Sequence, residues 1–471
     1  MTTSRDPDDL LVAYLADGME VLPDRVVDAV LDEVHRTHQR AVFGPWRTRS
    51  MLKTAFGAAA VVAVVVVGGA FFLFQRGQPA VLGGPSQTPA IASPTPGANA
   101  SPSVGPSTAA VQPRAASWTP TGDMVGAVDG PAVLLQDGKV LVVGGSGDGI
   151  SGSAQLYDPR TGTWAATGAM STPRGQFSVA PLLDGRVLVV GGAGDRGVLA
   201  SAELYDPSTR SWAASGSMHT ARYNTTATLL PDGKVLVAGG NSSQNASLAT
   251  AELYDPSTGS WTATGSMGTA RSAQIATLLR NGKVVAAGGS HLTVLNDHND
   301  PSYRLATAEL YDPGTGTWTP TADMTEVRTG ATTALLADGR VFLVGGVGDG
   351  FNVSAEIYDP TTGSWTATAT PSTLLMGSSV TVLRDGTVLL AGGMATKGAQ
   401  ASATAQVYDP SANTWTPTAN LHTPRGGHTA TLLLDGTVLV AGGVSEAGGV
   451  PTGPAPGWLS SAELYDPGSG H

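Results

Sequence analysis

Two short phrases alternate along the chain, and each of them occurs seven times. The first reads AELYDP in its commonest form, and six of its copies are followed closely by a tryptophan, whereas the second reads DGKVLVAGG or a near variant. The tyrosines of successive first phrases are 48, 49, 57, 47, 50 and 57 residues apart. A period of this size indicates a repeat architecture, in which each repeat forms one supersecondary unit. The seven tyrosines are Tyr157, Tyr205, Tyr254, Tyr311, Tyr358, Tyr408 and Tyr465.

Each repeat predicts four antiparallel strands. The stretch Gln274–Leu279 is typical of a first strand, and the Asp-Gly or Asn-Gly pair that follows predicts a two-residue hairpin turn with positive φ angles. The second strand, Val235–Ala238 in one repeat, is apolar at every position, which indicates burial on both faces. A double glycine ends that strand, the third strand carries Leu-Tyr, an Asp-Pro turn follows, and the fourth strand carries the tryptophan. One such sheet cannot bury both of its faces alone, but a ring of sheets can.

The double glycine, the tyrosine of the third strand and the tryptophan of the fourth strand together resemble the kelch repeat. The resemblance covers residues 116–467 and implies an all-β fold, a seven-bladed β-propeller similar to the central domain of galactose oxidase. A lone fourth strand, Ser117–Gly122, opens this region, and a third strand, Glu463–Pro467, ends it. We therefore expect the first strand to close the ring beside the last repeat, with residues 468–471 as a short tail.

The chain before the repeats differs from them in composition. Residues 1–54 are charged and show the apolar spacing of short helices, and residues 75–115 are rich in Pro, Ser, Gly and Ala, which predicts a disordered linker. Between them, residues 55–74 contain no charge and are long enough to span a bilayer as a helix. Basic residues precede this stretch, so the positive-inside rule predicts a single-pass plasma-membrane protein with a cytoplasmic N-terminus and an extracytoplasmic propeller. A cleaved signal peptide is the alternative, although it requires a much shorter leader.

Composition disfavours several classes of function. The net charge of −11 argues against a nucleic-acid partner, which requires a basic surface. The chain contains no cysteine, so it has no disulfide, no thiol nucleophile and no thiolate metal ligand. We expect a bacterial monomer with no resident cofactor, and a bound metal remains an open alternative.

A pattern of charges predicts buried ion pairs in five repeats. In these repeats an arginine lies ten residues after a tryptophan, and a glutamate lies two residues before the next tyrosine. The other two repeats replace the arginine with Val128 or Leu375, and the same two replace the glutamate with Gln155 or Gln406. A buried carboxylate without a cation is costly, so the joint replacement indicates that the two positions touch within one blade. The predicted pairs are Arg174–Glu203, Arg222–Glu252, Arg271–Glu309, Arg328–Glu356 and Arg425–Glu463. A ring of arginines that binds an anion at the propeller mouth is the alternative.

Candidate binding residues gather in the loops of one predicted face. Strand alternation places the loops after the double glycine and after the tryptophan on one face, and the Asp-Gly and Asp-Pro turns on the other. The first face varies between repeats, and variable loops on a rigid scaffold usually carry function. Its two longest loops are Ser290–Leu305 and Val444–Ser461. The candidate binding residues are His219, His291, Asp297, His298, Asp300, Tyr303, Arg304, His422, His428 and Trp458. Solvated loop residues without a ligand are the alternative interpretation.

These observations favour a binding module. We expect the variable face to bind a glycan, a cell-wall polymer or a protein outside the cell, while residues 1–54 relay that state inward or only anchor the chain. The alternative is a metal-dependent oxidase or carbohydrate-active enzyme in which His291, Asp297 and His298 contribute to a metal site. The resemblance to galactose oxidase implies copper chemistry that uses a cross-linked cysteine, and the absence of cysteine disfavours it. We therefore predict no catalytic residue.

Overall fold

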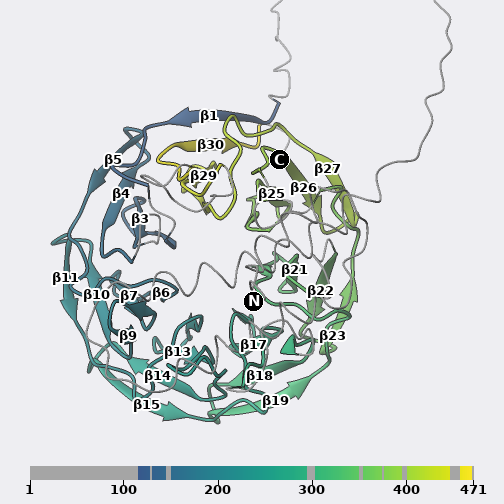
Figure 1. Ribbon diagram of the computed structural model, residues 1–471. Helices are drawn as coiled ribbons and strands as arrows, with labels where there is room; N and C mark the ends of the chain where they lie inside the picture. The colour runs from purple at the N-terminus through teal and green to yellow at the C-terminus, as the bar shows by residue number, and fades with distance from the viewer. Residues whose placement is uncertain are drawn as a thin grey trace, which may run out of the picture. The chain divides into compact units, whose positions relative to one another are not determined.

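The described residues form a closed ring of antiparallel sheets (Figure 1). The computed structural model describes residues 115–127, 130–144, 150–293, 303–348, 354–373, 376–394, 400–445 and 457–468. Within them lie seven four-stranded sheets, so the predicted all-β, seven-bladed propeller is confirmed. The predicted cytoplasmic helices, membrane-spanning stretch and linker lie outside the described residues. In the described part of the chain, no helix has the length and apolarity needed to cross a membrane.

Each blade takes its four strands in order from the inside of the ring to the outside (Figure 1). The first strands of blades one to seven are β2 Ala132–Leu134, β6 Ser178–Pro181, β12 Thr226–Leu229, β16 Ile275–Leu278, β20 Thr332–Leu335, β24 Ser379–Val382 and β28 Thr429–Leu432. The second strands are β3 Val140–Val143, β7 Val187–Val190, β13 Val235–Ala238, β17 Val284–Ala287, β21 Val341–Val344, β25 Val388–Ala391 and β29 Val438–Ala441.

The outer half of each blade consists of the strands that carry the tyrosine and the tryptophan. The third strands are β4 Ala154–Asp158, β10 Ala202–Asp206, β14 Ala251–Asp255, β18 Ala308–Asp312, β22 Ala355–Asp359, β26 Ala405–Asp409 and β30 Ala462–Asp466. The fourth strands are β5 Thr163–Ala166, β11 Ser211–Ala214, β15 Ser260–Thr264, β19 Thr317–Thr321, β23 Ser364–Ala367, β27 Thr414–Pro417 and, for blade seven, β1 Ser117–Thr121. A short extra hairpin, β8 Ala193–Gly194 with β9 Gly197–Val198, follows the second strand of blade two.

The ring closes through the strand that comes first in the sequence. β1 pairs antiparallel with β30, and Trp118 lies opposite Tyr465 with their ring centroids 5.0 Å apart. The Trp118 indole Nε1 also donates a hydrogen bond of 2.7 Å to the carbonyl of Ala419. The predicted closure of the last blade is therefore confirmed.

The Asp-Gly hairpin is longer than the sequence predicted. In blade two, the Leu182 amide donates to the Arg186 carbonyl, which leaves a loop of three residues rather than two. Gly185 has a φ of +87°, and the preceding Asp184 stays outside the positive-φ region. The Asp184 carboxylate instead accepts a hydrogen bond from the Arg186 amide. A type I turn closed by one left-handed glycine matches this geometry, so the prediction of a two-residue turn with two positive φ angles was wrong.

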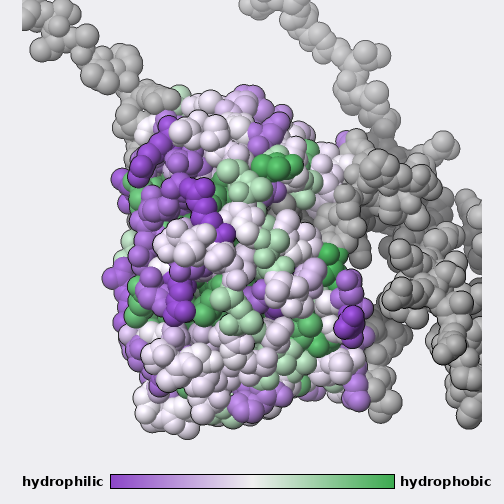
Figure 2. All heavy atoms as spheres, turned by 90° about the vertical axis from the view of Figure 1, so that its left-hand side faces the viewer, coloured by the Kyte–Doolittle hydropathy of each residue, from purple (hydrophilic) through white to green (hydrophobic). Residues whose placement is uncertain are grey.

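The hydrophobic core lies in the second strands and between the blades. All four residues of every second strand are buried. Each blade is also joined to the one before it by its aromatic residues: the Tyr205 hydroxyl lies 2.8 Å from Thr167 Oγ1, and the Trp212 indole donates to the Gly168 carbonyl. The outer surface carries mostly side chains of intermediate hydropathy, with small apolar and hydrophilic groups interspersed (Figure 2). Ring stability therefore comes from repeated contacts between neighbours.

Candidate functional site

The propeller has two faces of different character. We call the face formed by the Asp-Gly and Asp-Pro turns the turn face, where a hollow between two blades is lined by both kinds of turn, including Asp184 and Asp206. We call the opposite face, formed by the loops after the double glycines and after the fourth strands, the loop face. These two kinds of loop meet there, because the Gly192 amide donates to the Arg222 carbonyl of the next blade. The candidate binding residues that are described belong to loops of this face or lie beside them.

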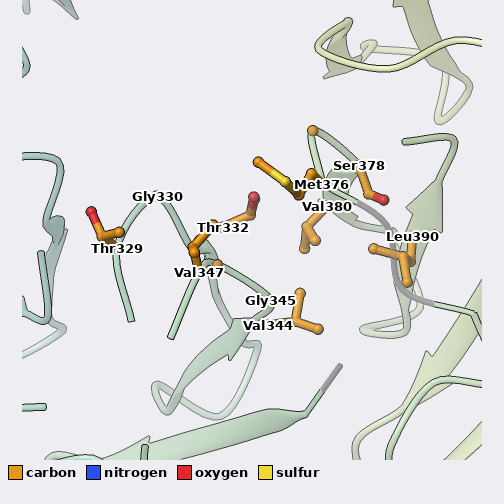
Figure 3. A pocket seen from close by; sticks show the side chains of 12 residues that line it. Thr329, Gly330, Thr332, Val344, Gly345, Val347, Met376, Ser378, Val380 and Leu390 are labelled. Atoms are coloured by element: carbon orange, nitrogen blue, oxygen red, sulfur yellow. The ribbon is translucent and has the colours of Figure 1, made fainter. Parts of the chain in front are cut away.

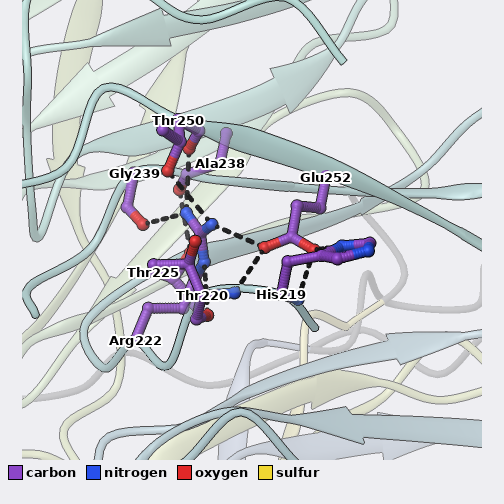
Figure 4. Close-up of polar contacts among 8 residues, drawn as sticks. All are labelled: His219, Thr220, Arg222, Thr225, Ala238, Gly239, Thr250 and Glu252. Atoms are coloured by element: carbon purple, nitrogen blue, oxygen red, sulfur yellow. Dashed lines mark hydrogen bonds and ion pairs between the residues drawn. The ribbon is translucent and has the colours of Figure 1, made fainter. Parts of the chain in front are cut away.

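A buried arginine organises the loop face in five blades, and blade three shows the arrangement (Figure 4). The Arg222 side chain is fully buried, and its Nη1 donates to the carbonyls of Gly239 and Thr250 at 2.9 and 2.8 Å. Its Nη2 lies 3.0 Å from Glu252 Oε1. The arginine therefore fastens the loop before the first strand to the ends of the second and third strands.

The glutamate holds the same loop from the other side. Glu252 accepts hydrogen bonds from the amides of His219 and Thr220 at 2.7 and 3.1 Å. Burial alone would raise the pKa of Glu252, but these hydrogen bonds and the charge of Arg222 outweigh it and hold the pKa below its ordinary value of 4.5. Burial also lowers the pKa of the Arg222 guanidinium. The pair is ionised at neutral pH, and the stability that Glu252 contributes is lost only as the pH falls below about 4.5.

The same ion pair is present in each of the five blades where the sequence indicates it. The nitrogen–oxygen distances are 3.0 Å for Arg174–Glu203, 3.0 Å for Arg222–Glu252, 2.7 Å for Arg271–Glu309, 2.8 Å for Arg328–Glu356 and 3.0 Å for Arg425–Glu463. All five arginines are at most 1% exposed, so they present no cationic surface to an anion in solvent. The interpretation of these arginines as an anion-binding ring is therefore wrong.

The two glutamine blades keep the loop fastened without a charge. Gln406 Oε1 accepts a hydrogen bond from the Ser372 amide, and its Nε2 donates to the Thr373 carbonyl. Gln155 does the same with Val125 and Gly126. The amide therefore supplies both a donor and an acceptor to the loop, which a carboxylate without an arginine could not do.

The exposed histidines of this face lie apart from one another. His219 and His422 occupy the same position in blades three and seven, and each ring Nδ1 lies about 3 Å from the buried glutamate of its own blade, at 2.9 Å and 3.0 Å respectively. Their side chains are 65% and 54% exposed, but two blades separate them on one side of the ring and three on the other. The two histidines therefore do not belong to one cluster.

Blade four brings three of the candidate residues together. The His291 amide donates to the Tyr303 carbonyl at 2.6 Å, and the His291 ring Nδ1 lies 2.8 Å from the Ala270 carbonyl. The Arg304 guanidinium lies over the Tyr303 ring, 5.3 Å from its centroid, and donates to the Gly348 carbonyl. Trp458 belongs to blade seven, where it pairs with Val444. The other candidates, Asp297, His298 and Asp300, lie outside the described residues.

The described residues do not offer a ligand set for a transition metal. Among them, no three His, Asp or Glu side chains lie close enough together to hold a metal ion. The carboxylates nearest to His219 and His422 are already bound to buried arginines. We therefore derive no chemistry through copper or zinc from this part of the chain.

His428 is a buried residue of the blade interface and not a surface ligand. Only 8% of it is exposed, and its Nε2 lies 2.8 Å from Ser379 Oγ of blade six. Burial, together with the charge of Arg425, lowers its pKa from 6.5 to about 3. The side chain is therefore neutral in the folded protein, which removes it from the set of candidate binding residues.

We expect His428 to make the propeller sensitive to mild acid. The unfolded chain binds a proton at this residue near pH 6.5, while the folded state resists it down to about pH 3. The free energy of unfolding is therefore fully retained above pH 6.5 and falls by up to about 1.4 kcal/mol per pH unit below it. His428→Gln, which copies Gln274 at the same position of blade four, should remove this loss between pH 6.5 and 4.5. Urea unfolding of the wild type and of His428→Gln at pH 7.0 and 5.5 measures this loss of free energy. An equal loss in the two proteins would contradict the assignment of the acid sensitivity to His428.

A hollow opens on the loop face between blades five and six (Figure 3). Its volume is about 100 Å³, and no charged side chain lines it. Thr332 and Val344 of blade five face Met376 and Leu390 of blade six across it. The Met376 side chain extends from blade six toward Thr332 (Figure 3). This hollow is a formed recess on the face where the variable loops lie.

The hollow lies beside a repeat position whose side chain differs in size between blades. Phe177, Gln274 and His428 each occupy this position and reach the first glycine of the preceding blade, where an added Cβ would lie only 2.6 to 2.7 Å from them. Blade six has Ser378 instead, whose hydroxyl turns back to the Gly392 carbonyl of its own blade at 2.8 Å. Gly345 of blade five lines the hollow. The sequence did not predict this site, because Thr225 and Ala331 occupy the same repeat position in other blades and are also small.

Comparisons with known proteins agree with the fold. Residues 129–171, 223–268 and 328–372 match the family model of the kelch motif. These three stretches carry kelch motifs, and the described residues form a seven-bladed β-propeller. A search of curated proteins finds no match to the sequence.

Two solved structures match this chain at low sequence identity. A novel fungal alcohol oxidase of the AA5 family, in complex with copper, matches with a TM-score of 0.60 and 20% identity over 75% of this chain and 76% of that one. The structure of YjhT matches with a TM-score of 0.48 and 17% identity over 62% of this chain and 95% of its own. At such identities the likeness concerns the fold alone.

Proposed function

We propose that this protein is a membrane-anchored binding module, which displays the kelch propeller outside the cell and binds a glycan, a cell-wall polymer or a protein. The observation that carries the proposal is the contrast between the two faces. The turn face repeats one pattern around the ring, whereas the loop face combines variable loops with solvent-exposed histidines. Rigid scaffolds with variable loops are typical of recognition surfaces. Residues 55–74 supply the membrane anchor in this proposal, and residues 1–54 remain in the cytoplasm.

An enzyme is the alternative, and blade four is the observation that favours it. His291, Tyr303 and Arg304 come together there at the base of a long loop. The similarity to a copper alcohol oxidase shows only that such a propeller can carry that chemistry. The proposal gives these residues the role of a polar contact surface for the bound ligand.

The proposal is tested with the isolated propeller, residues 115–471, whose ring is closed by its own strands. We expect it to sediment with purified insoluble cell-wall polymer or to bind members of a glycan array. Trp458→Ala on the loop face should weaken that binding about tenfold or more, as expected for an aromatic anchor. Leu434→Ser, at an exposed position of the turn face, is the matched control and should leave it unchanged. Unchanged binding by Trp458→Ala, or loss of binding in Leu434→Ser alone, would contradict the assignment to the loop face, and no binding to either material by the wild-type protein would contradict the glycan and polymer ligands.

A further inference from the structure

Several blades share one position on the loop face, which we call the rim position. It is the residue that pairs antiparallel with the residue directly after the double glycine, and it is described in blades two, three, four, six and seven. The residues at the rim position are Val198, Ser247, Arg304, Ala401 and Trp458. Within this described set Arg304 alone carries a charge, and it belongs to blade four.

Arg304 lacks the acidic partner that the buried arginines have. Its side chain is half-buried, its Nη1 donates to the Gly348 carbonyl of blade five, and its guanidinium lies over the Tyr303 ring. Its Nε is shielded from solvent and has no hydrogen-bond partner. Among the described residues it pairs with no carboxylate, whereas each buried arginine pairs with a glutamate. A partly desolvated cation without a counterion favours a bound anion.

The neighbouring blades hold Arg304 in place. Arg304 forms an isolated bridge with Ser290, and the Ser290 hydroxyl donates to Thr329 Oγ1 of blade five at 3.0 Å. On the other side, the Ser247 hydroxyl of blade three donates to the Ser290 carbonyl at 2.8 Å and accepts the Leu292 amide at 2.9 Å. The backbone of the arginine therefore lies in a hydrogen-bonded frame of three blades. Little of this frame has to be ordered when a ligand binds.

The surface beside this frame is polar but uncharged. The blade-three loop that joins it covers residues 241–247 and reads NSSQNAS, so all but one of these side chains carry a hydroxyl or a carboxamide. Asn245 is exposed there and accepts a hydrogen bond of 2.7 Å from the Tyr223 hydroxyl. Blades six and seven instead have apolar residues at the two paired positions, namely Met394, Ala401, Val444 and Trp458. Hydroxyls and carboxamides both donate and accept hydrogen bonds, as sugar hydroxyls require.

The geometry points to an acidic sugar as the ligand of this part of the loop face, an inference that deepens the proposed binding function and rests on it. The single carboxylate or phosphate of the sugar accepts hydrogen bonds from Arg304 Nη2, which makes none to a described residue. The polar loop of blade three binds the sugar hydroxyls. Because the chain has a net charge of −11, it repels a polymer with many negative charges, so the ligand is a glycan with one anion at this site.

Three small sugars test the inference. Methyl β-D-glucuronide is the carboxylate probe, glucose 6-phosphate is the phosphate probe, and methyl β-D-glucoside is the neutral control. The propeller is labelled with ¹³C at its tyrosine rings, and Tyr303→Phe assigns the Tyr303 resonance, which an anion on Arg304 should move. We expect a saturable shift with a dissociation constant of about 1–10 mM for at least one acidic probe. The neutral glucoside should bind about tenfold more weakly or less, and the tighter acidic probe identifies the preferred oxyanion.

Variants of two arginines locate the probe. Arg304→Gln should weaken binding of the acidic probe about tenfold or more, and Arg304→Lys, which keeps the charge, should lose less. The matched control is Arg196→Gln, which changes an exposed arginine in the turn between β8 and β9 and should leave binding unchanged. No saturable shift with either acidic probe, full binding by Arg304→Gln, or an equal loss in Arg196→Gln would overturn the site. Equally tight binding of N-acetyl-aspartate-N-methylamide would overturn the sugar as its ligand.

The proposed function is measured separately, by binding to insoluble cell-wall polymer and to a glycan array. Polymer binding without any shift by the acidic probes would overturn this inference and leave the proposed function intact. A saturable shift that depends on Arg304, without binding to polymer or array, would support the site and contradict the proposed polymer ligand.

Discussion

Arg222→Leu is expected to lower the free energy of unfolding by about 3–5 kcal/mol, because it leaves the Glu252 carboxylate buried without its cation. The change also removes two donors from the carbonyls of Gly239 and Thr250. The effect should be far larger than that of an exposed ion pair such as Lys234–Asp232, whose groups lie 3.7 Å apart at the surface. Equilibrium urea unfolding of the wild type and the variant measures it.

Glu252→Gln is expected to restore part of the stability that Arg222→Leu removes. Adding Glu252→Gln to Arg222→Leu recreates the Leu375 and Gln406 combination that blade six already contains. The double variant should therefore be about 1–3 kcal/mol more stable than the sum of the two single effects implies. Additive effects would show that the two side chains do not act as a unit, and the account of the ion pairs would fail.

Trp118→Ala is expected to cost about 3–5 kcal/mol, the usual loss for truncating a buried tryptophan. Trp118 is 5% exposed, packs on Tyr465 and donates to Ala419, although it comes from the opposite end of the repeat region. Its loss removes the aromatic contact between the two strands that close the ring. Trp118→Phe keeps most of the apolar contact. Its cost should be the free energy of the small apolar area that is lost, plus about 1 kcal/mol for the missing N–H donor.

A matched control separates ring closure from ordinary packing. Trp415 makes the same contacts inside blade six, where its indole donates to the Ala369 carbonyl at 2.9 Å. Trp415→Ala should therefore destabilise the propeller by a similar amount. A loss below about 1 kcal/mol for Trp118→Ala, with a full loss for Trp415→Ala, would show that β1 does not close the ring in solution.

Much of the fold could be predicted because the same sequence pattern occurs in seven repeats. The buried second strands follow from runs such as Val235–Ala238, and the ring closure follows from a last repeat that lacks its tryptophan while Trp118 stands alone. The Asp-Gly hairpin was misjudged because the dipeptide fits two turn types. The choice between them depends on one more residue of loop, which the dipeptide alone does not reveal.

The candidate site was harder to predict, because the sequence shows which residues share a loop and not which of them meet. His428 belongs to a polar loop sequence but lies inside a blade interface, since its position in the repeat points toward the preceding blade. Its equivalents Phe177 and Gln274 fill the same space. The hollow beside Ser378 is invisible to motif reading, because motifs do not show that this repeat position faces the preceding blade. Recognising it requires knowledge of which repeat position faces the neighbouring blade.

The most direct test of the claim that this face binds rather than catalyses is the metal content of the propeller, purified and dialysed without chelator. The account predicts no copper, zinc or calcium near one equivalent. It also predicts the same trace values for the wild type, His291→Ala and His298→Ala. A near-stoichiometric metal that falls in either variant would contradict the account and would move the function to a metal-dependent enzyme centred on the long loop of blade four.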